Sequence, residues 1–161
     1  MFDRRSDERN DPPTEGLMLV TDGERFGVDG ARLVRVPFVP GESALFLGRD
    51  DGTPLFLSVH AEAVVTHTFR EAAAVLEPDE VSLLSYAQGM LTWARRTRFC
   101  SACAHPLEPR LAGYSRACPG CGAEYYPRLD PAVMIMAVHD GRILLAQHQG
   151  RASVFWSTLA G

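Results

Sequence analysis

Cys100-Ser-Ala-Cys103 and Cys118-Pro-Gly-Cys121, separated by fourteen residues, hold all four cysteines of the chain. Each C-x2-C pair can bend round one side of a metal ion, and the intervening loop can bring the second pair to the other side. Four thiolates arranged in this way suit a tetrahedral divalent ion. The spacing therefore predicts a four-cysteine zinc ribbon, with Cys100, Cys103, Cys118 and Cys121 as ligands of a structural Zn²⁺ that has no open coordination position.

Two other uses of the cysteines are less consistent with the sequence. Disulfides need an oxidising compartment, and the polar N-terminus has no apolar segment typical of a signal peptide. A redox C-x-x-C motif usually occurs singly before a helix, whereas here two matched pairs lie in a turn-rich stretch. We therefore predict a cytoplasmic protein with reduced thiols.

Composition is that of an ordinary globular protein of one or two small domains. The 161 residues are 46% hydrophobic and 22% charged, and no run of about 20 apolar residues predicts a membrane span. The net charge of −4 argues against a general nucleic-acid coat protein.

The part before the cysteines is predicted to be β-rich. Residues 1–15 are charged and proline-containing, so we expect a disordered tail. Residues 16–98 form the expected N-terminal domain. In it, Asp22-Gly23 and Asp51-Gly52 separate short apolar runs, a strong signal for antiparallel hairpins.

One helix is predicted to connect this domain to the ribbon, over about residues 79–96. Pro78 and acidic residues suit its first turn, and Arg95 and Arg96 suit its last. An apolar stripe along one face indicates a helix that packs on a core, formed by Leu83, Leu84, Ala87, Met90, Leu91 and Ala94.

After the predicted ribbon, residues 99–127, the chain becomes very apolar. Asp140-Gly141 predicts another hairpin, and the unbroken run Val133–Met136 predicts strands buried on both faces. Nothing that follows in the chain supplies the cover. We therefore expect residues 128–161 to be the start of a domain that is cut off at Gly161.

These blocks together resemble the NADH pyrophosphatase family of Nudix hydrolases. The resemblance is close from about residue 99 to residue 161 and looser before it. It is carried by Phe99-Cys-x2-Cys103, Cys118-x2-Cys121, Tyr125-Tyr-Pro-Arg-Leu-Asp-Pro131, Ile143-Leu-Leu-Ala-Gln-His148 and Ser157-Thr-Leu-Ala-Gly161.

The resemblance implies an α+β fold in three parts: a β-rich N-terminal domain with one connecting helix, a four-cysteine zinc ribbon, and the first strands of an incomplete Nudix α/β/α sandwich. It implies hydrolysis of the pyrophosphate of NAD(H) to NMN(H) and AMP, or removal of NAD caps from RNA. It further implies Mg²⁺ or Mn²⁺ as catalytic ion and a homodimer. Matching by position, the family's substrate contacts fall on Tyr126, Ala160 and, less closely, Arg70.

The family's Nudix box, G-x5-E-x7-R-E-x-x-E-E-x-G, would begin at about Gly161, and none of its glutamates is present. Those carboxylates hold the ions that polarise the pyrophosphate and activate water. We therefore expect the 161-residue chain to be catalytically incompetent alone.

Two other hypotheses stay open. The chain could be a stand-alone zinc-ribbon module for RNA or a protein partner, in which Tyr125 and Tyr126 stack on bases among Arg95, Arg96, Arg98, Arg110, Arg116 and Arg128. It could also be a dimerisation remnant that pairs with a full-length homologue through its apolar C-terminal hairpin.

Overall fold

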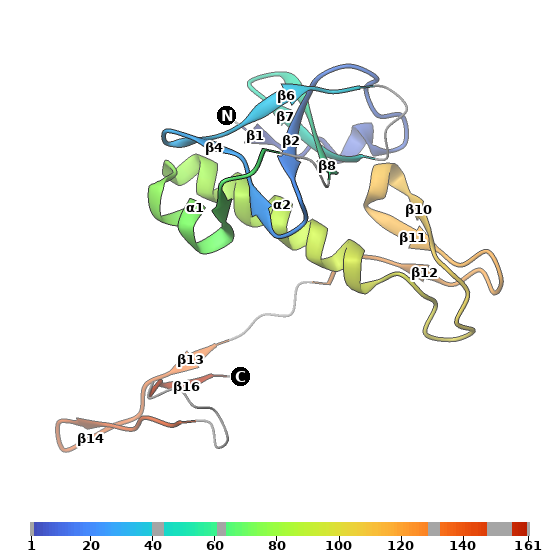
Figure 1. Ribbon diagram of the computed structural model, residues 1–161. Helices are drawn as coiled ribbons and strands as arrows, with labels where there is room; N and C mark the ends of the chain where they lie inside the picture. The colour runs from blue at the N-terminus through green and yellow to red at the C-terminus, as the bar shows by residue number, and fades with distance from the viewer. Residues whose placement is uncertain (1, 40–43, 61–63, 129–132, 148–155, 161) are drawn as a thin grey trace. The chain divides into compact units, whose positions relative to one another are not determined.

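The computed structural model describes residues 2–39, 44–60, 64–128, 133–147 and 156–160 (Figure 1). The chain divides into two compact units, Met1–Pro127 and Arg128–Gly161. Each unit is described by itself. In the described part of the chain, no helix combines the length and the apolar character that crossing a membrane would need.

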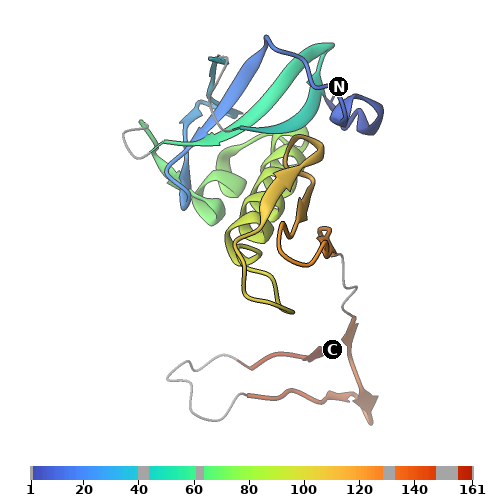
Figure 2. The ribbon, with the colours of Figure 1, turned by 90° about the vertical axis from the view of Figure 1, so that its right-hand side faces the viewer.

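A curled sheet forms the centre of the first unit (Figures 1 and 2). Its main path follows the order β1-β7-β8-β2-β3-β9, and β6 pairs with β2 off this path. Only the β2–β8 pair is parallel among these strands. The strand bounds are β1 Phe2–Asp3, β2 Leu17–Thr21, β3 Arg25–Phe26, β6 Arg35–Pro37, β7 Leu45–Asp50, β8 Thr53–Val59 and β9 His67–Thr68.

Both hairpins predicted in the N-terminal part are confirmed. Strands β2 and β3 pair antiparallel across Asp22-Gly23, and β7 and β8 pair antiparallel across Asp51-Gly52. Asp51 and Gly52 have φ values of 46° and 80°, the positive values that a tight hairpin turn requires. A further small ladder joins β4, Val28–Asp29, to β5, Arg32–Leu33.

The start of the chain is ordered where its composition indicated a disordered tail. Strand β1 pairs with β7, and a 3-10 turn, η1, covers Ser6–Arg9. Glu8 forms an ion pair with Arg49, and the Arg9 guanidinium lies 3.3 Å from the centre of the Tyr114 ring. Composition alone does not predict this ordered segment, because its charged side chains pair with residues that are distant in sequence.

Gly48 explains how β1 can approach the sheet. Its φ of 143° is one that side chains rarely adopt, and a Cβ added there would collide with the backbone carbonyl oxygen of Asp3. Only glycine therefore allows β1 to lie this close to β7.

In the part of the chain that the structure describes, two α-helices follow the sheet strands, where the sequence predicted one. The predicted helix is α2, Pro78–Arg96, which buries five of the six predicted stripe residues and leaves Ala94 half-buried. The helix that was missed is α1, Phe69–Val75, which begins with a reciprocal capping box between Thr68 and Glu71. That pattern was readable in the sequence, but seven residues are too few for a clear apolar periodicity.

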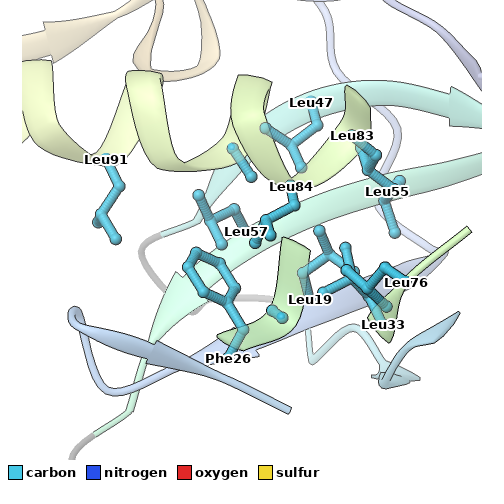
Figure 3. Packing of buried hydrophobic residues seen from close by; sticks show 12 residues of the cluster. Leu19, Phe26, Leu33, Leu47, Leu55, Leu57, Leu76, Leu83, Leu84 and Leu91 are labelled. Atoms are coloured by element: carbon cyan, nitrogen blue, oxygen red, sulfur yellow. The ribbon is translucent and has the colours of Figure 1, made fainter. Parts of the chain in front are cut away.

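The main core lies between α2 and the sheet (Figure 3). Leu83, Leu84 and Leu91 of α2 belong to one cluster with the sheet residues Leu19, Leu47, Leu55 and Leu57. Their strand neighbours Met18, Phe46 and Phe56 form a separate cluster. Because successive side chains of a strand point to opposite faces, the two clusters occupy the two faces of the sheet.

A buried carboxylate ties α2 to the strands. One Glu80 oxygen accepts a hydrogen bond from the Leu33 N–H at 3.0 Å, and the other accepts one from Arg35 at 2.8 Å. Arg35 also donates to Asp50 at 2.7 Å. Burial raises the pKa of Glu80, but the hydrogen bonds from Arg35 and the Leu33 N–H outweigh it and hold that pKa below its ordinary value.

The ribbon follows α2 in the same compact unit. Its sheet consists of β10 Glu108–Arg110, β11 Ser115–Ala117 and β12 Glu124–Tyr125, with a 3-10 turn, η2, at Leu111–Gly113. The ribbon contacts the N-terminal sheet directly, because the Tyr114 hydroxyl donates to the Leu47 carbonyl oxygen at 3.0 Å. Ala112 of η2 packs on the cluster of Met18, Phe46 and Phe56.

The described residues of the second unit form two two-stranded ladders: β13 Met134–Ile135 with β16 Leu159–Ala160, and β14 Val138–His139 with β15 Arg142–Ile143. The hairpin predicted at Asp140-Gly141 is confirmed. The predicted burial of Val133–Met136 is wrong, since Met134 is 74% exposed and the other three are 56–62% exposed. Among residues 133–147 and 156–160 these strands pair only two by two, and no layer formed by those residues covers them.

Candidate metal centre

Each C-x2-C pair folds into the same tight turn. In the first, the Cys100 carbonyl oxygen accepts from the Ala104 N–H at 2.9 Å, and the Cys100 N–H donates to His105 at 2.8 Å. The second knuckle has the same two bonds. The Gly122 N–H donates to the Cys118 carbonyl oxygen at 3.0 Å, and the Cys118 N–H donates to the Ala123 carbonyl oxygen at 2.8 Å. The backbone therefore forms two equivalent knuckles, each of which presents two sulfur atoms.

The four sulfur atoms converge. Cys100 Sγ lies 3.6 Å from Cys121 Sγ, and Cys103 Sγ lies 3.3 Å from Cys118 Sγ. All four lie within 4.8 Å of one another. A tetrahedron with zinc–sulfur bonds of about 2.3 Å has edges of about 3.8 Å, whereas a disulfide bond measures about 2.05 Å. The cysteines are free thiols in an arrangement that fits a four-coordinate divalent ion.

Burial differs within each knuckle. The first cysteine of each pair, Cys100 or Cys118, is buried, while Cys103 and Cys121 are exposed. The two buried cysteines form a small cluster with Leu107, against which Ala123 and Tyr125 pack. Among the described residues, no other group of three or more histidine, cysteine or acidic side chains could share an ion.

The thiols differ in acidity in the absence of metal. A hydrogen bond with the Tyr125 hydroxyl is the largest influence on Cys100 and lowers its pKa to about 6. The His105 N–H lowers the pKa of Cys103, but the Cys118 thiol and burial raise it to about 12. Burial raises the pKa of Cys118, but hydrogen bonds from the Cys121 N–H and other groups outweigh it and lower that pKa. The Ala123 N–H lowers the pKa of Cys121, but hydrogen bonds with the Cys100 and Cys118 thiols outweigh it and raise that pKa. Neighbouring thiols therefore differ in how readily they lose their protons, which all four must do to bind a cation as thiolates.

Substitutions at one pair of equivalent positions in the two knuckles are predicted to change stability in opposite directions. Ala104 has a φ of 62°, and Gly122 at the matching position has a φ of 76° with open space around it. A non-glycine residue in this left-handed region costs about 1 kcal/mol. We expect Ala104→Gly to stabilise the ribbon by about that amount and Gly122→Ala to destabilise it similarly.

Chemical denaturation of the metal-loaded protein checks both signs, because each variant is the other's control. Shifts of the same sign would show that the knuckles are not equivalent in their backbone conformation.

The residues matched to substrate contacts lie in three different places. Tyr126 follows β12, is 53% exposed, and donates its hydroxyl hydrogen to Glu124 at 2.6 Å, which raises its pKa. Arg70 is exposed near the start of α1, before α2, whereas Tyr126 comes after α2. Ala160 is exposed in β16 of the second unit, opposite Met134. Within the first unit, Arg70 therefore belongs to α1, whereas Tyr126 directly follows β12.

Several arginines around the ribbon are engaged within the protein. Arg95 donates to the Gly23 carbonyl oxygen, and Arg110 pairs with Glu108. Arg98 and Arg116 lie over the rings of Phe99 and Trp93 respectively. These contacts favour a structural role for the basic residues over a surface dedicated to nucleic acid.

Comparison with known proteins places this site in a recognised module. Residues 95–126, which include all four cysteines, match the NADH pyrophosphatase zinc ribbon domain. The match begins in the last turn of α2 and ends at Tyr126.

Similar proteins extend the match along the chain. An NAD-capped RNA hydrolase NudC from Stutzerimonas stutzeri is 33% identical over 149 residues, which are 89% of this chain and 53% of that protein. The human mitochondrial NAD(P)H pyrophosphatase NUDT13 is 36% identical over 73% of this chain and 35% of its own length. The NudC of Mycobacterium bovis is 34% identical over 76% and 42%. The chain thus spans about a third to a half of these relatives.

Proposed function

Since this chain belongs to the NADH pyrophosphatase family of Nudix hydrolases, we propose that it takes part in hydrolysing the pyrophosphate of NAD(H), or of the NAD cap of RNA, to NMN(H) or its RNA equivalent and AMP. The observation that carries this proposal is the convergence of four thiols inside the stretch that matches the NADH pyrophosphatase zinc ribbon.

In this function Cys100, Cys103, Cys118 and Cys121 hold a Zn²⁺ ion. Four thiolates fill the tetrahedral shell, so the ion offers no position to water or substrate. Its contribution is structural: it keeps the two knuckles together and with them β12, after which Tyr126 follows.

Three residues are proposed to contact substrate. Tyr126 has an exposed ring that can form a wall of a nucleotide pocket. Arg70 offers an exposed guanidinium, and Ala160 offers backbone groups at the end of β16. We propose that each of these residues contacts substrate, and that the protein is a homodimer in the cytoplasm.

A catalytic Mg²⁺ or Mn²⁺, which the family resemblance implies, would polarise the pyrophosphate and activate water. The sequence contains none of the Nudix-box glutamates that would hold it. Removing that charge stabilisation removes the main contribution to phosphoryl transfer. We therefore propose that the 161-residue chain alone is inactive.

A parallel assay tests both statements. The natural gene product, its length established by intact mass, and the 161-residue chain are each incubated with NADH or NAD-capped RNA and Mg²⁺, and AMP is quantified. We expect release by a natural product that carries the Nudix box and none above background by the 161-residue chain. Robust release by the latter would overturn its proposed inactivity. No release by a natural product carrying the box would overturn the proposed function.

A further inference from the structure

The Tyr125 hydroxyl lies at the metal centre. One hypothesis from the sequence was instead that the ring of this residue stacks on bases. It is 3.3 Å from Cys100 Sγ, 3.0 Å from the Ser101 N–H nitrogen and 3.0 Å from Ser101 Oγ. Its ring is half-buried against the cluster of Cys100, Leu107 and Cys118. The side chain is therefore directed into the ribbon.

The three contacts form a complete hydrogen-bonding set. A phenol has one proton to donate and two lone pairs that accept. The Ser101 N–H donates to one lone pair, and the Ser101 hydroxyl can donate to the other. The phenol proton is then directed to the sulfur of Cys100, which is a better acceptor as a thiolate than as a thiol.

This arrangement occurs at only one of the two described knuckles. Pro119 occupies the position equivalent to Ser101 and has no N–H to offer. The Cys118 thiol is acted on by the backbone N–H groups of Cys121 and Gly120 and by neighbouring cysteines. Cys100 receives similar backbone contacts from Ala102 and Cys103, and the phenol in addition.

We propose that Tyr125 is a positioning residue of the metal centre, which holds the Cys100 thiolate on the ion through its hydroxyl. Partners of this kind orient a ligand and tune the charge on its donor atom, and their loss typically weakens metal binding 10- to 100-fold. The proposal adds a residue to the proposed Zn²⁺ site and is independent of pyrophosphate hydrolysis.

The test is Tyr125→Phe in the whole 161-residue chain, which keeps the ring and removes only the hydroxyl. With the Zn²⁺-loaded protein and an excess of a chromogenic chelator, we expect metal release about 10-fold faster than from the wild type. Tyr126→Phe removes the hydroxyl of the next residue, which donates to Glu124, and is expected to release metal at the wild-type rate.

Cobalt substitution separates a role at the thiolate from a general loosening of the ribbon. In the Co²⁺-loaded protein, a thiolate without its phenol donor is easier to oxidise. We expect the sulfur-to-cobalt charge-transfer band to move to longer wavelength in Tyr125→Phe and to stay in place in Tyr126→Phe. Unchanged release and an unchanged band in Tyr125→Phe would overturn the proposal. A wild-type chain that bound neither Zn²⁺ nor Co²⁺ would overturn the metal centre itself.

Discussion

Replacing Cys118 with serine is expected to abolish stoichiometric zinc binding and to unfold the ribbon. Cys118 is a buried thiol, with its sulfur 3.3 Å from that of Cys103. Binding of structural zinc contributes about 10–16 kcal/mol in small zinc-finger peptides, so the loss of one thiolate removes much of the energy that holds the knuckles together. Metal analysis of the purified chain gives the zinc content directly.

The unfolding should be local. The main core uses residues of the strands, of α1 and its C-cap Leu76, and of α2, and none of the ribbon. In Cys118→Ser we therefore expect trypsin to cleave after Arg110 and Arg116, while the segment up to α2 stays resistant.

His105→Ala is the matched control for this prediction. His105 is exposed, and its imidazole lies against Gly120, so it is the side chain that could be mistaken for a ligand. We expect this variant to keep its zinc. Full zinc content in Cys118→Ser, or loss of zinc in His105→Ala, would contradict a site made of four thiolates.

Replacing Glu80 with alanine is expected to lower the free energy of unfolding of the first unit by about 3 kcal/mol. The substitution leaves the buried Leu33 N–H without its acceptor and removes one of the two carboxylates that neutralise Arg35. Because Asp50 still pairs with Arg35, the effect falls at the lower end for a broken buried ion pair. Urea denaturation followed by circular dichroism measures the change.

Asp79→Ala removes the neighbouring acid on the same first turn of α2. Asp79 is exposed, so its favourable interaction with the helix N-terminus contributes about 0.3–1 kcal/mol. Equal losses in the two variants would mean that the Glu80 network contributes nothing beyond this general effect.

The Glu80 network also predicts an acid-sensitive contribution to stability. The pKa of Glu80 is lowered in the folded state, so the unfolded state binds more protons as the pH falls. The contribution is complete above the unfolded pKa of about 4.3 and is lost as the pH falls through the lower folded pKa. Urea midpoints measured at falling pH should therefore decline more steeply for the wild type than for Glu80→Ala.

Local patterns predicted most of what depends on neighbouring residues. The Asp-Gly turns at residues 22, 51 and 140 all lie in hairpins, and the apolar stripe of α2 faces the core. The short helix α1 and the strand β1 were missed, because each is too brief for periodicity to reveal it. The exposed run Val133–Met136 shows the opposite failure, since an apolar pattern indicates a preference for burial without supplying a covering layer.

Spacing alone was enough to indicate the metal centre. Two C-x2-C pairs encode the geometry of their own knuckles, so all four candidate ligands were readable from the chain. Tertiary structure alone decided which groups support them and how the ribbon is attached: the hydroxyl of Tyr125 at Cys100, that of Tyr114 at Leu47, and Glu80 between α2 and the strands. These contacts join residues 25 to 67 positions apart, and no local pattern specifies a distance between atoms that only folding brings together.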